Sequence, residues 1–125
     1  MYEKEAYAIV GAALEVHDNI GCGFSEKVYQ DALEVEFMQR GIPYQRETPF
    51  HVIYKGVTLK SEFIPDFVCF GKIIVELKSV REVEDVFKAQ AINYGKVSGF
   101  KLAMLLNFGS LSLETQYFPI KKNLQ

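Results

Sequence analysis

Cysteine is scarce in this chain, and so are long apolar runs. Cys22 and Cys69 are the only two cysteines among 125 residues, too few and too far apart for a zinc-binding motif, and we expect both to stay reduced. No run approaches the ~18 uninterrupted apolar residues that a membrane span needs. The first residues, Met1-Tyr2-Glu3-Lys4-Glu5, lack the basic and apolar regions of a signal peptide. We therefore expect a soluble, cytoplasmic protein without a membrane segment.

An excess of basic residues is also missing. The chain has 14 Lys and Arg against 16 Asp and Glu, a net charge of −2, which argues against tight nonspecific binding to a polyanion, since such binding comes from clustered cations. Local basic groups remain candidates, although ordinary solvated surface is the simpler explanation for each of them. They are Lys72, Lys78, Arg81 and Lys88, then Lys96 and Lys101, and finally Lys121 and Lys122. At 49% hydrophobic content, we expect one domain over residues 1–125.

Helices are predicted at both ends of a central group of strands. Apolar residues recur at helical spacing from about Tyr2 to His17, and Ser25 is the predicted N-cap of a second helix that runs to about Gln39. Turn residues and alternation predict strands over 44–54, 57–69 and 73–80, with a bend or bulge at Pro65. A third helix over 83–97 and strands over 102–107 and 115–118 complete the chain.

Two carboxylates and a lysine occur inside the apolar hairpin of the second and third strands. If this hairpin turns about Gly71, Asp66 lies opposite Glu76, with Cβ atoms roughly 4.5–5.5 Å apart. Lys78 projects from the same face, because the side-chain period of a strand is two. Such a cluster suits a divalent-metal site for phosphodiester hydrolysis, because Mg²⁺ takes one or two carboxylates together with water and phosphate oxygens. A cross-strand ion pair, with Lys78 neutralising both carboxylates, explains the spacing equally well.

The order Pro65-Asp66 followed by Glu76-Leu77-Lys78 resembles the motif of the PD-(D/E)XK nuclease superfamily. Within it the chain resembles the small GxxExxY proteins, whose name is matched by Gly23-Phe24-Ser25-Glu26-Lys27-Val28-Tyr29. The similarity covers nearly the whole chain. Its further segments are Val10–His17, Tyr54–Gly56, Gln90–Tyr94 and Leu105–Gly109.

This resemblance implies a fold and an activity. The fold is α/β (α+β), with the restriction-endonuclease-like αβββαβ core, a central mixed sheet flanked by helices, and one extra helix at the N-terminus. The activity is metal-dependent hydrolysis of nucleic-acid phosphodiester bonds, with Mg²⁺ or Mn²⁺ as cofactor and DNA favoured over RNA. One site per chain would favour a two-fold homodimer for cutting both strands of a duplex.

The resemblance also assigns the catalytic residues, namely Glu26, Asp66, Glu76 and Lys78. Asp66 and Glu76 would hold the metal together with the backbone carbonyl of Leu77, and Lys78 would generate or position the attacking water. Glu26 would ligate the metal or position its water. The structural alternative for Glu26 is a first-turn carboxylate that interacts with the helix dipole.

Tyr29, Gln90 and Tyr94 are expected to support the site or to contact the substrate. For Gln90 and Tyr94, one turn apart on the third helix, a core amide and a boundary tyrosine are equally good explanations. We expect a structural role for His17 at a helix end. Two other functions stay open: a non-catalytic nucleic-acid-binding or protein-binding domain that retains the fold, and a scaffold with a buried salt-bridge network.

Overall fold

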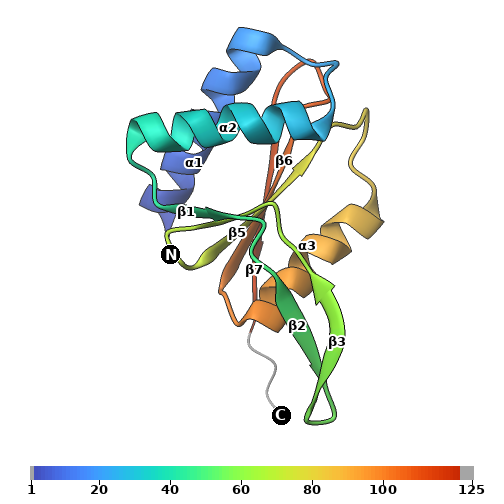
Figure 1. Cartoon of the computed structure of the whole chain (residues 1–125). Coiled ribbons are helices and arrows are strands. Elements are labelled where there is room, and N and C mark those ends of the chain that lie inside the picture. The colour runs from blue at the N-terminus through green and yellow to red at the C-terminus, as the bar shows by residue number, and fades with distance from the viewer. Residues whose placement is uncertain (1, 122–125) are drawn as a thin grey trace.

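The computed structural model describes residues 2–121, so Lys122 of the predicted basic groups lies outside the described residues. Figure 1 shows two helices, a run of strands, a third helix and two closing strands. The elements are α1 (Glu3–Ile20), α2 (Glu26–Arg40), β1 (Tyr44–Arg46), β2 (Phe50–Tyr54), β3 (Val57–Phe63), β4 (Phe67–Cys69), β5 (Ile73–Lys78), α3 (Asp85–Ser98), β6 (Leu102–Asn107) and β7 (Glu114–Pro119). Within these residues, no helix is both long and apolar enough to cross a membrane.

The central sheet has five strands in the order β1-β4-β5-β6-β7. β5 and β6 run parallel and are connected through α3, whereas the other neighbours are antiparallel. The sheet is therefore mixed, as expected for the predicted α/β fold with flanking helices and an extra N-terminal helix. The carboxyl ends of β5 and β6 meet at Lys78 and Asn107, and this end of the sheet carries the site.

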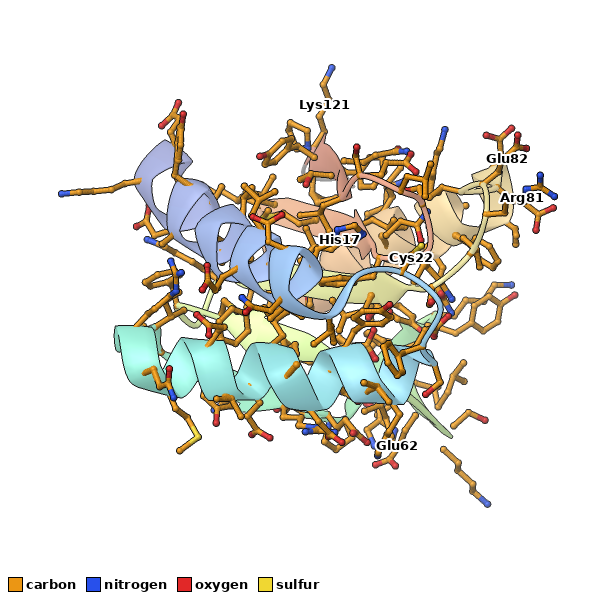
Figure 2. All side chains as sticks on the ribbon, turned by 90° about the horizontal axis from the view of Figure 1, so that it is seen from above. His17, Cys22, Glu62, Arg81, Glu82 and Lys121 are labelled. Carbon is orange, nitrogen blue, oxygen red and sulfur yellow. The ribbon has the colours of Figure 1, made fainter. Side chains whose placement is uncertain are left out.

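Helices cover both faces of the sheet, and β5 accordingly has apolar side chains on both sides. Ile73, Val75 and Leu77 pack with α1 and α2 in the larger core, while Ile74 packs with Ala91 of α3 in the smaller one. Figure 2 shows α1 and α2 side by side over the first face. Each fully buried aliphatic side chain contributes about 1.5–3 kcal/mol. This two-sided burial holds β5 rigidly in the middle of the molecule.

The hairpin of β4 and β5 has the predicted register. Phe67 pairs with Val75 and Cys69 pairs with Ile73, around a turn in which Phe70 and Gly71 have φ of 56° and 66°. Glycine adopts this left-handed conformation without steric cost, so Gly71 suits the turn. The register places Asp66 opposite Glu76.

Two of the predicted strands were too long. The predicted strand 57–69 is two strands, β3 and β4, which lie in different sheets and are separated by Ile64–Asp66. The predicted strand 44–54 is likewise divided into β1 and β2, with Glu47 at a positive φ of 56° just before Pro49. Proline lacks the N–H that continues a ladder, so Pro49 and Pro65 both end pairing. As a result, β2 and β3 form a separate hairpin that projects from the body (Figure 1).

The helix ends agree with the predictions to within about one turn. α1 continues three residues beyond His17, to Ile20, and α3 begins at Asp85. Ser25 is the N-cap residue of α2, although its side chain makes no capping hydrogen bond. Gly41 ends α2 in the left-handed conformation, with φ of 69°, as glycine commonly does at this position.

Candidate active site

The carboxyl groups of Asp66 and Glu76 are held by each other's strand. The backbone N–H of Asp66 donates to Glu76 Oε1 at 3.1 Å. The backbone N–H of Leu77 donates to Asp66 Oδ2 at 2.7 Å. Each carboxyl group accepts a backbone N–H of the other strand at hydrogen-bonding distance, so this reciprocal pair fixes both side chains next to one another. The predicted convergence of the two carboxyl groups is confirmed.

Burial makes the two negative charges costly. Glu76 is only 6% exposed, and burial, followed by the charge of Asp66, raises the pKa of Glu76 to about 9. Burial also raises the pKa of Asp66, and the charge of Glu26 adds to this effect. The positive charge of Lys78 opposes both shifts. Two such groups are stable when one is protonated or when a cation lies between them.

Lys78 lies on the same side of the sheet, but its ammonium rests on an aromatic ring. Its Nζ lies 4.3 Å from the centre of the Phe87 ring, in the first turn of α3. In the described part of the chain, Lys78 forms no direct ion pair with Asp66 or Glu76. The structure therefore disfavours the alternative in which the cluster is a simple cross-strand ion pair.

Glu26 reaches the edge of the site from the first residue of α2. Its Oε2 accepts the backbone N–H of Ser79 at 3.4 Å, just beyond Lys78. Glu26 is exposed, whereas Tyr29, Leu33 and Phe37 on the same helix are fully buried. Glu26 thus lies on the same side of α2 as the buried apolar residues. It is nevertheless exposed, because this end of α2 extends past the end of the sheet.

Tyr29 supports the loop that precedes Glu26. The fully buried ring stacks on Phe108 with centroids 4.6 Å apart. Its hydroxyl donates to the carbonyl of Gly21 at 2.6 Å and accepts the N–H of Phe24 at 3.3 Å. The Ser79 hydroxyl donates to the carbonyl of Phe24 at 2.6 Å. These contacts attach the loop to the end of β5, so Tyr29 has a structural role.

Gln90 and Tyr94 form a pair on α3. The Gln90 amide donates to the Tyr94 hydroxyl at 3.0 Å, and the Tyr94 ring stacks on Phe63 with centroids 4.6 Å apart. Burial raises the pKa of Tyr94, and the charge of Glu76 raises it further. The structure therefore brings the Tyr94 hydroxyl into the electrostatic field of the two carboxyl groups, and it brings Gln90 there through Tyr94.

Two supporting side chains were not identified from the sequence. The Gln30 amide donates to the backbone carbonyl of Asp66 at 3.3 Å, and Arg46 Nη2 donates to Gln30 Oε1 at 3.1 Å. Arg46 also bonds Asp31 and Glu34, each at 2.7 Å. Burial lowers the pKa of Arg46, but hydrogen bonds with Asp31, Glu34 and Glu47 outweigh this effect. The pKa of Arg46 is therefore raised above its usual range. No local pattern indicates this network, because its members are separated along the chain.

Asn107 holds the segment that follows Lys78. Its fully buried side chain accepts the N–H of Val80 at 3.0 Å and donates to the carbonyl of Val80 at 2.9 Å. The same oxygen accepts the N–H of Gly109 at 3.0 Å. A polar residue that ends the apolar run Leu102–Leu106 was the available signal, since a buried amide requires partners.

His17 has a structural contact, in agreement with its predicted role. Its Nε2 lies 3.0 Å from the carbonyl oxygen of Ser110, to which it can donate, and its ring stacks near Phe108 at 6.2 Å. Figure 2 shows His17 between α1 and the strands. His17 thus connects α1 to the loop after β6.

The basic groups do not gather into one patch. Lys72 pairs with Glu5 at 3.0 Å and Lys88 lies 3.7 Å from Asp85. Arg81 and Lys121 lie on different sides of the molecule (Figure 2).

A pocket of about 490 Å³ lies at the end of the sheet opposite the carboxylate site. Its lining includes Ala6, Leu102 and Pro119. This pocket does not belong to the carboxylate site.

The donor set at Asp66 and Glu76 fits a hard cation. Mg²⁺ is commonly bound through one or two carboxylates, with water and substrate oxygens completing its shell. Here the two carboxyl groups are held together, and Leu77 between Glu76 and Lys78 offers a backbone carbonyl. Among residues 2–121 there is no group of three or more His, Cys, Asp or Glu side chains that could hold a metal, so Glu26 does not complete an all-protein site.

A comparison with protein families identifies the chain. The model of the PD-(D/E)XK nuclease superfamily matches residues 3–119. The chain belongs to the PD-(D/E)XK nuclease superfamily. This superfamily is one of nucleases. In this PD-(D/E)XK protein, Glu76 and Lys78 lie on β5, and Asp66 directly precedes β4.

Other comparisons concern the fold. The crystal structure of SSO0001 is similar to this structure with a TM-score of 0.59 and 17% sequence identity over 99% of this chain. This PD-(D/E)XK chain spans 61% of the length of the SSO0001 chain. At this identity the likeness is one of fold. No curated protein matches the sequence.

Proposed function

We propose that this protein is a divalent-metal-dependent nuclease that hydrolyses phosphodiester bonds, with DNA favoured over RNA as its substrate. The observation that carries the proposal is the reciprocal hydrogen bonding of Asp66 and Glu76, beside Lys78, in a member of a nuclease superfamily. Their raised pKa values are consistent with a site that is completed by a cation. The narrower resemblance to GxxExxY proteins belongs to the same proposal.

In this mechanism Asp66 and Glu76 would hold Mg²⁺ or Mn²⁺ through their carboxyl oxygens, together with the carbonyl of Leu77. The bound metal would supply Lewis-acid stabilisation of charge on the phosphate and on the leaving oxygen. Lys78 would orient or deprotonate the attacking water, or offset charge on the scissile phosphate.

The remaining residues would act around this centre. Glu26, at the edge of the site, would position a water molecule or a second metal. Tyr94, which lies in the field of Glu76, would contact a substrate phosphate, and Gln90 would orient the Tyr94 hydroxyl through their hydrogen bond. Tyr29 would act indirectly, by holding the loop before Glu26.

Cleavage assays test the proposal. Plasmid, linear duplex, single-stranded DNA, flap DNA and RNA are incubated with Mg²⁺ or Mn²⁺ and, separately, with EDTA. We expect metal-dependent cleavage that falls by about 10²-fold or more in Lys78→Ala, the usual effect of losing a general acid or base. Lys72→Ala is the matched control, because Lys72 lies in the same hairpin but pairs with Glu5. Equal cleavage by wild type and Lys78→Ala would contradict the assignment.

A second candidate function is binding of nucleic acid or protein without cleavage. The lack, among residues 2–121, of a cluster of three metal-ligating side chains favours it. Calorimetric titration with Mg²⁺ separates the two functions. If the protein is a nuclease, it should bind Mg²⁺, and Asp66→Asn and Glu76→Gln should each weaken that binding. A binding domain does not require the metal.

A further inference from the structure

The backbone carbonyl of Asp66 is held by two donors from outside its own hairpin. The side-chain amide of Gln30 in α2 donates to it at 3.3 Å, and the backbone N–H of Glu47 donates to it at 3.1 Å. The ladder of β4 and β5 begins at Phe67, so it does not fix the peptide group of Asp66. Within residues 2–121, Gln30 is the one side chain that bonds this carbonyl.

The Gln30 side chain is polar and buried, with 6% of its surface exposed. A buried amide needs partners for both of its ends. Its Oε1 accepts a hydrogen bond from Arg46 Nη2 at 3.1 Å. Because a guanidinium group can only donate, Oε1 must face Arg46, and Nε2 is left to face the carbonyl of Asp66. Arg46 therefore determines which end of the Gln30 amide points toward the site.

Arg46 is itself held firmly. It is the last residue of β1 and is paired with Phe67 of β4, so its backbone is part of the central sheet. Its side chain bonds Asp31 and Glu34 of α2, each at 2.7 Å. The guanidinium thus has fixed partners on both sides, and the Gln30 amide that it orients is restrained in turn.

We propose that Gln30 is a positioning residue for Asp66. By fixing the peptide group of Asp66, Gln30 keeps the Asp66 carboxyl group on the N–H of Leu77, where Oδ2 accepts it at 2.7 Å. The carbonyl and the side chain of Asp66 share one Cα, so rotation of this peptide group would displace Oδ2. The consequence for metal binding rests on the proposed function, whereas the orientation of the carboxyl group does not.

The same contact connects α2 to the carboxylate pair. Gln30 follows Glu26 by four residues, or about one helical turn. The hydrogen bond from Gln30 to Asp66 therefore ties the first turns of α2 to the start of β4. In this way Gln30 also sets the spacing between Glu26 and the Asp66 carboxyl group.

The amide proton of Leu77 reports the orientation of the Asp66 carboxyl group, because its chemical shift depends on their hydrogen bond. Proton–nitrogen NMR spectra are recorded without metal for wild type, Gln30→Met and Asp66→Ala, the last of which defines the Leu77 signal without the bond. We expect Gln30→Met to move the Leu77 signal toward its position in Asp66→Ala. Gln39→Met is the matched control, since Gln39 is exposed on the same helix, and it should leave the signal in place.

Calorimetric titration with Mg²⁺ measures the consequence for the site. Loss of a partner that orients a metal ligand typically weakens metal binding by about 10–100-fold, so we expect the dissociation constant to rise by about tenfold or more in Gln30→Met and to stay unchanged in Gln39→Met. An unmoved Leu77 signal in Gln30→Met would overturn the proposal, as would equally tight binding of Mg²⁺ by Gln30→Met and wild type. A wild type that binds no Mg²⁺ would contradict the nuclease function, and the Leu77 signal would still decide the role of Gln30.

Two controls separate a local effect from misfolding. The N–H of Val80 bonds the Asn107 side chain and has no link to Gln30, so its signal should stay in place unless the whole fold changes. Arg46→Lys keeps a positive charge but lacks the planar fork of donors. It should therefore move the Leu77 signal in the same direction as Gln30→Met but by less, and an unmoved signal would contradict the role of Arg46.

Discussion

The ammonium of Lys78 lies 4.3 Å from the centre of the Phe87 ring. Lys78 ends β5 and Phe87 lies in the first turn of α3, so this contact connects the strand that carries the site to the helix that packs beside it. A cation over an aromatic face gains about 0.5–2 kcal/mol, depending on its hydration. The ring therefore restrains a long side chain that would otherwise sample many rotamers.

Replacing Phe87 by Leu should reduce cleavage without abolishing it. Loss of about 0.5–2 kcal/mol corresponds to a decrease of roughly 2–30-fold, and we expect it in kcat more than in KM, because Lys78 would act on the reacting groups. Phe87→Tyr keeps the aromatic face and should retain activity. Phe100→Leu is the control, since Phe100 contacts Phe50. Identical kinetics for wild type and Phe87→Leu would show that the ring does not position Lys78.

The metal-free protein should lose stability as pH rises. Burial raises the pKa of Glu76 to about 9, so the folded state holds this proton more tightly than the unfolded chain. The resulting stabilisation is complete below the usual carboxyl pKa of 4.5 and is lost as pH rises through about 9. With EDTA present, the Tm should fall over this range, and Glu76→Gln should flatten the profile.

Added Mg²⁺ should restore part of the stability at the alkaline end, because a cation that binds only the folded state stabilises it. Glu62→Gln, on the exposed hairpin, serves as the control and should keep the wild-type profile. If the Tm of wild type and of Glu76→Gln changed with pH in the same way, Glu76 would not be the group that binds the stabilising proton.

Arg46→Ala should destabilise the fold by about 1.5–3 kcal/mol, the range for hydrogen bonds to charged groups. The change removes donors to Asp31, Glu34 and Gln30 together. Denaturation in urea measures the free energy of unfolding. The control is Arg40→Ala, which breaks the exposed pair of Arg40 with Glu36 and should cost only about 0.3–0.5 kcal/mol. Equal losses in the two variants would mean that the Arg46 network adds nothing beyond a surface ion pair.

The two thiols should differ strongly in reactivity. Cys22 is exposed on the loop between α1 and α2 (Figure 2). Cys69 is buried in β4, and burial raises the pKa of its thiol to about 12. Since the thiolate is the reactive form, a chromogenic disulfide reagent should titrate one thiol rapidly in the native protein and the other only after unfolding. Cys22→Ser should remove the rapid phase, and two rapid thiols would be incompatible with a buried β4.

Some of the site could be predicted from local rules. The turn at Gly71 and the two-residue period of strands were sufficient to place Asp66 opposite Glu76, because both residues lie within one short hairpin. The same rules located strand 102–107 at its observed bounds and put Glu26 at the start of a helix. In each case the determining interactions are close in sequence.

Tertiary packing decided the rest, because it joins residues that local patterns do not connect. Periodicity suggested continuous strands over 44–54 and 57–69. Both strands are interrupted near Pro49 and Pro65, so β2 and β3 form a hairpin outside the central sheet. The partner of Lys78 is Phe87 on another element rather than a carboxylate of its own hairpin. Gln30 reaches the carbonyl of Asp66 from α2, across 36 positions of sequence.

The sequence by itself thus determined the local geometry of the carboxylate pair, since that geometry follows from backbone pairing within one hairpin. Only the tertiary structure decided what surrounds the pair: the burial that raises the pKa of Glu76, the ring beneath Lys78, and the exposed position of Glu26 at the edge. These features depend on how α2 and α3 pack against β5, and such packing is set by the combined fit of many distant side chains.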